Sequence, residues 1–120
     1  MPDLPRHLKR LLRQHAGLAY EEELRRALLP LADDFDRWRG GAVDSGELAE
    51  RIHAFHQGPA REIWKVYNHA SPNLSVASAI SRGILPRENV QPELLDVLGP
   101  ELAFYRSLDD DPPGELLVEE

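Results

Sequence analysis

The chain has 120 residues and no cysteine, so we expect a single domain without disulfides, zinc–thiolate sites or a thiol nucleophile. No apolar run approaches the roughly 20 residues that cross a bilayer. The net charge is −7, but the last twelve residues hold six acids and no base, so residues 1–108 sum to −1. We expect a soluble cytoplasmic protein without membrane contact, with a helical domain over residues 1–108 and a disordered acidic tail over residues 109–120.

The N-terminal segment has the pattern of a short basic amphipathic helix from Asp3 to His15. Leucines at helical spacing form one stripe, and basic residues fall on the other side. The stripe consists of Leu4, Leu8, Leu11 and Leu12, and the basic residues are Arg6, Lys9, Arg10 and Arg13. Asp3 can cap this helix, and Gly17 is predicted to end it. We expect the leucines to dock on the body; alternatively, the basic side binds an acidic partner or nucleic acid.

A second apolar stripe runs from Ala19 to Arg39 and keeps one helical phase for four turns. Pro30 interrupts its middle, where a proline costs about 3 kcal/mol because it removes a hydrogen bond and crowds the preceding carbonyls. The phase is nevertheless the same on both sides, and Pro30 lies on the polar side. We therefore predict one long kinked helix rather than two, ending at Gly40 and Gly41.

Three further helices are predicted between residues 44 and 83. Asp44 or Ser45 can cap the first, and Gly58–Pro59 separates it from the second. Ser71–Pro72 repeats the start signal, with serine as the cap and proline in the first turn. The broad apolar arc of residues 59–68 predicts a central helix, and the small side chains of residues 73–82 predict a helix packed closely against it.

The remaining segment, residues 84–108, is divided by prolines into short helical pieces that we expect to wrap the body. Large aromatic side chains, including Trp38 and Trp64, are in phase with the apolar stripes and are predicted to lie in the core. The predicted fold is all-α: a compact single-domain bundle of five to six helices. Its core is expected to come from residues 19–39, residues 45–69 and the helix that begins at Ser71.

The most chemically suggestive residues lie just before Gly58. Glu50, His53 and His56 recur at intervals of three, and the Glu50-x-x-His53 unit is the one that carboxylate-bridged di-iron bundles use. Such a bundle needs a second unit, which here only a homodimer can supply. Because His53 falls far from the apolar stripe, we favour an exposed His53 and a hydrogen-bonded boundary His56, with no metal and no cofactor.

The same helix contains a second candidate, metal-free RNA cleavage. Arg51 and His56, separated by four residues, resemble the arginine–histidine signature of HEPN ribonucleases, which are small all-α domains. The resemblance implies that these two side chains meet at the scissile phosphate in a dimer. Ile52 departs from the pattern, because those enzymes commonly have a polar residue after the arginine. On a regular helix Arg51 and His56 also point about 140° apart, so a bend at Gly58 or a partner copy is required.

Arg61, in the first turn after Pro59, is a candidate for binding a phosphate or carboxylate, although we expect it to pair with Asp34 or Asp36. The sequence contains no glycine-rich phosphate loop, no nucleophile elbow and no interleaving of aromatic and basic residues. It therefore favours a non-catalytic protein-interaction or regulatory module, whose partner is another protein or a second copy of the chain. The ribonuclease and the dimeric metal-binding bundle are the alternatives.

Overall fold

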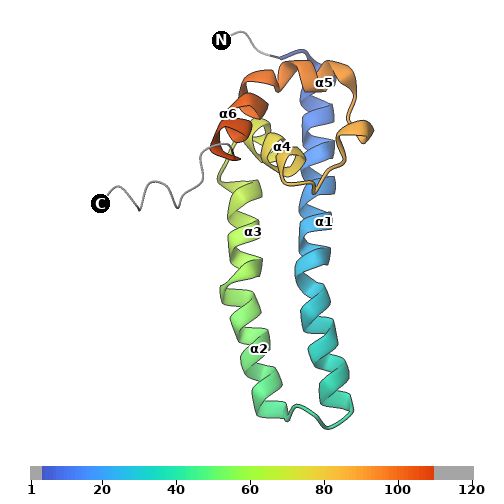
Figure 1. The fold of residues 1–120 in the computed structure, drawn as a ribbon, viewed down its shortest axis with the longest axis vertical. Coiled ribbons are helices and arrows are strands. Elements are labelled where there is room, and N and C mark those ends of the chain that lie inside the picture. Colours follow the sequence, from blue (N-terminus) through green and yellow to red (C-terminus); the bar gives the residue numbers. More distant parts are fainter. Residues whose placement is uncertain (1–3, 110–120) are drawn as a thin grey trace, which may run out of the picture.

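The computed structural model describes residues 4–109, which form a single all-helical body with no strand among them (Figure 1). Residues 1–3 and residues 110–120 of the predicted acidic tail lie outside the described residues. Asp109, the predicted start of the tail, is the last residue of the final helix, and the N-cap of the first helix is Pro5 rather than the predicted Asp3. The elements are α1 (Arg6–Arg39), α2 (Ser45–Gln57), α3 (Pro59–Asn68), α4 (Pro72–Ser81), the short 3-10 helix η1 (Arg87–Asn89), α5 (Pro92–Val97) and α6 (Gly99–Asp109). The all-α prediction is confirmed. None of the described helices combines the length and the apolar character needed to cross a membrane.

Helix α1 is a single helix of 34 residues, about 50 Å long, so the prediction that Gly17 ends a first helix is wrong. The buried residues Leu8, Leu12, His15 and Ala19 continue one helical stripe past Gly17, which is exposed. A glycine inside a helix costs only about 1 kcal/mol relative to alanine, and packing on both sides outweighs that cost. The helix also continues through Pro30, as predicted.

The two halves of α1 bury different sides of the helix. On an ideal wheel, the stripe of Leu8 and Ala19 lies about 140° from the stripe of Leu24 and Leu31. The first half packs against α4 and α5, and the second half runs antiparallel to α2 and α3 (Figure 1). Helix α1 is therefore a spine shared by two parts, which we call the head (residues 4–19 and 71–109) and the arm (residues 20–70).

The hydrophobic core lies in the head. The predicted contribution of the helix that begins at Ser71 is confirmed, whereas the prediction that residues 19–39 and 45–69 supply the rest is wrong apart from Ala19. The buried members of the core come from the first half of α1, from α4, and from the segment between residues 84 and 102. They are Leu8, Leu12, Ala19, Val76, Ala77, Ala79, Ile80, Ile84, Leu85, Val90, Leu94, Leu98 and Leu102. Helix α4 packs mainly against α1 and α6. Its predicted close packing on α3 is confined to the end of α3, where the Ser75 hydroxyl donates to the Val66 carbonyl at 2.8 Å.

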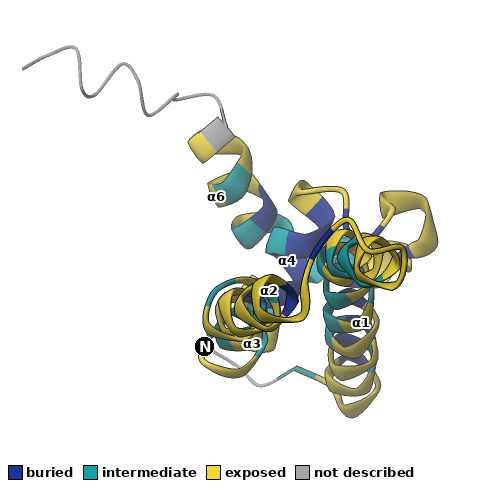
Figure 2. Ribbon diagram, turned by 90° about the horizontal axis from the view of Figure 1, so that it is seen from below, coloured by how far each residue is buried: buried dark blue, intermediate teal, exposed yellow. Residues whose placement is uncertain are grey.

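Few apolar residues of the arm are buried. Its only buried apolar residues are Val43, Leu48 and Ile63, and Figure 2 shows α2 and α3 as mostly exposed ribbons. Trp38 and Trp64 are 39% and 46% exposed, so their predicted core placement is wrong, as is the prediction of a central third helix. A hairpin in which each helix has one neighbour can cover its apolar stripes on one side only.

The start and stop signals predicted between residues 40 and 83 are confirmed. Asp44 caps α2 by accepting a hydrogen bond from the Glu47 amide at 2.8 Å, and Ser71 caps α4. Gly41 and Gly83 have φ values of 83° and 77°, in the left-handed region that glycine enters without steric cost. These signals depend only on neighbouring residues, which explains why they could be predicted.

Replacing Pro30 by alanine is expected to stabilise the protein by about 1–2 kcal/mol. The lost hydrogen bond and the steric clash of an interior proline together cost about 3 kcal/mol in a regular helix, and replacement by alanine recovers part of this cost. Part of the gain is offset because proline restricts the unfolded chain by about 0.4–1 kcal/mol. Urea unfolding followed by circular dichroism measures the change. Pro86→Ala, outside the α-helices, is the control and should destabilise slightly; a Pro30→Ala protein no more stable than wild type contradicts this interpretation.

Candidate functional site

Arg51, one half of the predicted ribonuclease pair, is held by two carboxylates. Its guanidinium donates to Asp34 Oδ1 at 2.5 Å and to Glu47 Oε2 at 2.6 Å, and these bonds raise the pKa of Arg51. Arg37 lies 3.9 Å from the same Asp34 oxygen. These four side chains define what we call the ionic face of the arm. Arg51 therefore links α2 to α1 and has its charge balanced inside the chain.

His56 lies on the other side of the arm from Arg51. Together with Arg61 and Trp64 it lines an open groove of about 540 Å³ between α1 and the α2–α3 junction, whereas Arg51 lines a separate groove of about 330 Å³. The two grooves share no residue. Within one chain the structure therefore does not bring Arg51 and His56 together.

Arg61 does not form the predicted ion pair with Asp34 or Asp36. Asp34 pairs with Arg51, Asp36 pairs with Arg39 at 2.7 Å, and Arg61 has no ion-pair partner among residues 4–109. The hairpin register explains the difference, because Asp34 lies opposite α2 rather than α3. The charge of Arg61 is therefore free at the edge of the groove that it shares with His56.

The predicted metal ligands do not converge. Glu50 and His53 are exposed on α2, as predicted for His53. His56 lines the groove beside Trp64 but is also exposed and makes no side-chain hydrogen bond within residues 4–109, so its predicted hydrogen-bonded boundary position is wrong. Within the part of the chain that the structure describes, no three histidine or acidic side chains are placed so that they could hold one metal ion. The dimeric metal-binding hypothesis needs a second copy and stays a prediction.

Opposite the ionic face, the arm presents an apolar surface. We call it the apolar face and define it by Leu24, Leu28, Ile52 and Trp64. Leu24 and Trp64 line the His56 groove, and on ideal helical wheels Leu28 falls beside Leu24 and Ile52 beside His56. Leu28, Ile52 and Trp64 are 43%, 40% and 46% exposed. The sequence stripes indicated that these residues are apolar, but only the hairpin geometry shows that nothing in residues 4–109 covers them.

The basic residues predicted to bind an acidic partner lie on the first turns of α1. Leu8 and Leu12 dock in the head, as expected, and this leaves Arg6 and Arg10 exposed, while Lys9 and Arg13 line a pocket of the head. No ion pair is formed by these four basic side chains within residues 4–109.

Comparison with known proteins yields no match: no family model, curated protein or solved structure resembles this chain significantly.

Proposed function

We propose that this protein is a non-catalytic interaction module that binds a helical segment of another protein, or of a second copy, through the apolar face of its arm. The observation that carries the proposal is the asymmetry of the hairpin. One face is closed by the Arg51–Asp34–Glu47 ion pairs, and the other exposes Leu28, Ile52 and Trp64. Exposed apolar side chains that gather on one surface typically mark an interaction site.

The geometry favours a helical partner. Two antiparallel helices leave an apolar groove between them, and an amphipathic helix that lies in such a groove buries residues at i, i+3, i+4 and i+7. A second hairpin laid across the apolar face produces a four-helix arrangement with the same contacts. The free charge of Arg61 at the edge of this face suits a partner that carries a carboxylate beside its apolar stripe.

Site-specific photocrosslinking tests this function. A benzoylphenylalanine placed at Ile52 on the apolar face is expected to yield a discrete crosslinked product in cells that naturally make the protein. The matched control is the same residue at Ala54, which is exposed on the same helix but lines the groove on the ionic side. Mass spectrometry then identifies the product as a second copy or another protein. No product from position 52, or equal products from both positions, contradicts the proposal.

A further inference from the structure

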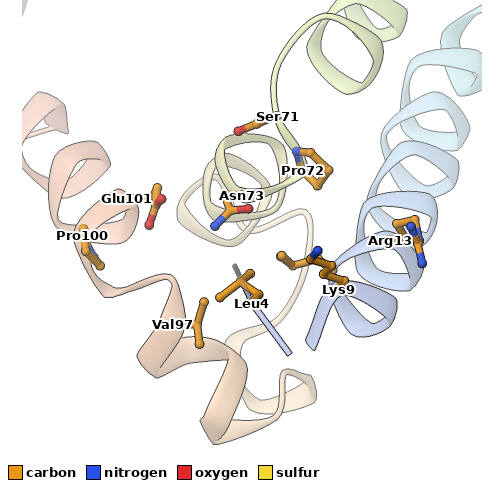
Figure 3. A pocket seen from close by; sticks show the side chains of 10 residues that line it. Leu4, Lys9, Arg13, Ser71, Pro72, Asn73, Val97, Pro100 and Glu101 are labelled. Carbon is orange, nitrogen blue, oxygen red and sulfur yellow. The ribbon is translucent and has the colours of Figure 1, made fainter. Parts of the chain in front are cut away.

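The head contains a pocket that the arm and its apolar face do not involve. It has a volume of about 610 Å³, within the usual range for small-molecule sites, and it lies between the first half of α1 and the starts of α4 and α6 (Figure 3). Leu12, a buried member of the core, and the half-buried Leu4 and Val97 supply apolar lining, and Pro72 and Pro100 add to it. None of the lining residues within residues 4–109 is aromatic. The pocket therefore suits an aliphatic chain rather than a ring that needs a stacking surface.

The α1 side of the pocket is basic. Lys9 and Arg13 both line the pocket, and their spacing of four places them one turn apart on the same side of α1 (Figure 3). Both are exposed, and neither forms an ion pair within residues 4–109. A guanidinium donates two parallel hydrogen bonds to one carboxylate, and a neighbouring ammonium provides a further donor. The exposed charge of the pocket thus attracts a carboxylate.

Glu101, the one acid among the described lining residues, does not cancel this charge. It lies in the first turn of α6 and is less exposed than the two bases, and its Oε1 atom is buried. Two bases against one acid leave the lining with a net charge of +1. A ligand with a single negative charge neutralises it, whereas a cationic ligand is repelled. The half-buried Asn73 also lines the pocket, and its amide can donate a further hydrogen bond to an anion.

We infer that the head pocket binds a single-chain fatty acid, with its carboxylate at Lys9 and Arg13 and its aliphatic chain against the apolar lining. The lining provides affinity because it removes methylene groups from water, and the two bases fix the orientation of the chain. Arg61 also lies beside apolar residues, in the groove of the arm. The experiment therefore locates the bound ligand as well as measuring its affinity.

Titration of the isotope-labelled full chain with octanoate, followed by nuclear magnetic resonance, tests the inference. The backbone amide signals of Lys9, Arg13 and Asn73 are expected to shift saturably, while the indole signals of Trp38 and Trp64, both in the arm, stay unchanged. Octan-1-ol is expected to bind at least about tenfold more weakly, which corresponds to one hydrogen bond to a charged group. Hexanoate should bind about fourfold to fifteenfold more weakly than octanoate, because two fewer methylenes are buried.

Three results overturn the inference. The first is the absence of saturable shifts at the pocket up to about 10 mM octanoate, which is weaker than small-molecule sites usually bind. The second is an equal affinity for octanoate and octan-1-ol, because the bases then contribute nothing. The third is a saturable shift of the tryptophan signals alone, because octanoate then binds to the arm.

Two double variants assign the carboxylate to its bases. Lys9→Gln with Arg13→Gln is expected to weaken octanoate about tenfold or more and to leave octan-1-ol within about twofold, which abolishes the difference between the two ligands. Arg6→Gln with Arg10→Gln is the matched control: it removes the same charge from exposed positions of the same helix that do not line the pocket, and should change octanoate binding by no more than about twofold. Circular dichroism verifies that each variant is folded. If both double variants weaken octanoate equally, the attraction comes from the overall charge of α1 and the inference is wrong.

Discussion

Replacing Leu98 by alanine is expected to destabilise the protein by about 2–5 kcal/mol. Leu98 is fully buried at the joint between α5 and α6, and its backbone donates to Leu94 and accepts from Leu102 in the two adjoining helices. Truncation removes buried apolar surface and leaves a cavity that rigid neighbours fill only in part. A small domain has a total stability of about 5–15 kcal/mol, so this loss is a large fraction of the whole. Urea unfolding monitored by circular dichroism measures it.

The control for Leu98 is Leu29, a leucine on α1 that is 52% exposed. Leu29→Ala should change stability by no more than about 0.5 kcal/mol, because surface substitutions away from special features have small effects. The contrast tests where the core lies. If both substitutions cost the same, the stability of the protein does not depend on the head as the structure indicates.

The sequence was sufficient to place most helix boundaries, because each depends on a few adjacent residues. As predicted, α1 ends before Gly40–Gly41, α2 begins after Asp44, the break between α2 and α3 falls at Gly58–Pro59, and α4 begins at Ser71–Pro72. Gly17 was misread because a glycine indicates only that a helix can end there. Whether it does end depends on packing of distant segments against both neighbouring turns, and a local pattern contains no information about that packing.

The position of the core could not be obtained from amphipathic strength. The strongest apolar stripe belongs to α3, yet α4 is the more buried helix, from Ser75 to Ala77 and again at Ala79 and Ile80. A helix that is apolar or small on every side indicates burial, and this signal was present in residues 73–82. The sequence contained no signal for the helices against which α4 packs. The contacts of α4 with α6 join segments that are separated in sequence and meet only in the folded chain.

In the candidate sites, too, contacts between neighbouring residues could be predicted and contacts between distant segments could not. The Arg51–Glu47 pair follows from their spacing of four on one helix, but the bond to Asp34 depends on the register of the hairpin. Glu101 has no distinguishing sequence signal beyond its place in a first turn. Its Oε1 atom is buried without a hydrogen-bond partner among the described residues because α6 packs on α4, and this packing joins segments that are distant in sequence.

The joint between arm and head is held by a network of three side chains, and breaking it is expected to cost about 2–3 kcal/mol. Glu23 on α1 accepts from the two terminal guanidinium nitrogens of Arg82, at 2.6 and 3.1 Å, and from the Tyr67 hydroxyl at 2.9 Å. The Glu23 side chain is only 17% exposed. Arg82→Ala therefore leaves a largely buried carboxylate with one donor, and hydrogen bonds to charged groups contribute about 1.5–3 kcal/mol.

Arg25→Ala is the matched control for Arg82→Ala. Arg25 lies on α1, the helix that carries Glu23, and pairs at 2.8 Å with Glu22 three residues before it on the surface. Loss of this surface pair should change stability little. Tyr67→Phe should cost about 1 kcal/mol, because it removes only the neutral donor. Equal effects of Arg82→Ala and Arg25→Ala, measured by urea unfolding at neutral pH, contradict a structural role of the network.

The network also predicts how the effect of Arg82→Ala depends on pH. Burial opposes ionisation of Glu23, but the hydrogen bonds from Arg82 and Tyr67 outweigh it and lower the pKa of Glu23 below 4.5. Burial and the neighbouring carboxylate raise the pKa of Tyr67, so the phenol stays a donor. A carboxylate with a depressed folded pKa stabilises the protein above its unfolded pKa of about 4.3, and this contribution is lost as pH falls through the folded pKa. The stability difference between wild type and Arg82→Ala should therefore be constant from about pH 5 to 8 and shrink below about pH 4. A difference that persists unchanged at pH 3 shows that Arg82 acts through packing rather than through the Glu23 carboxylate.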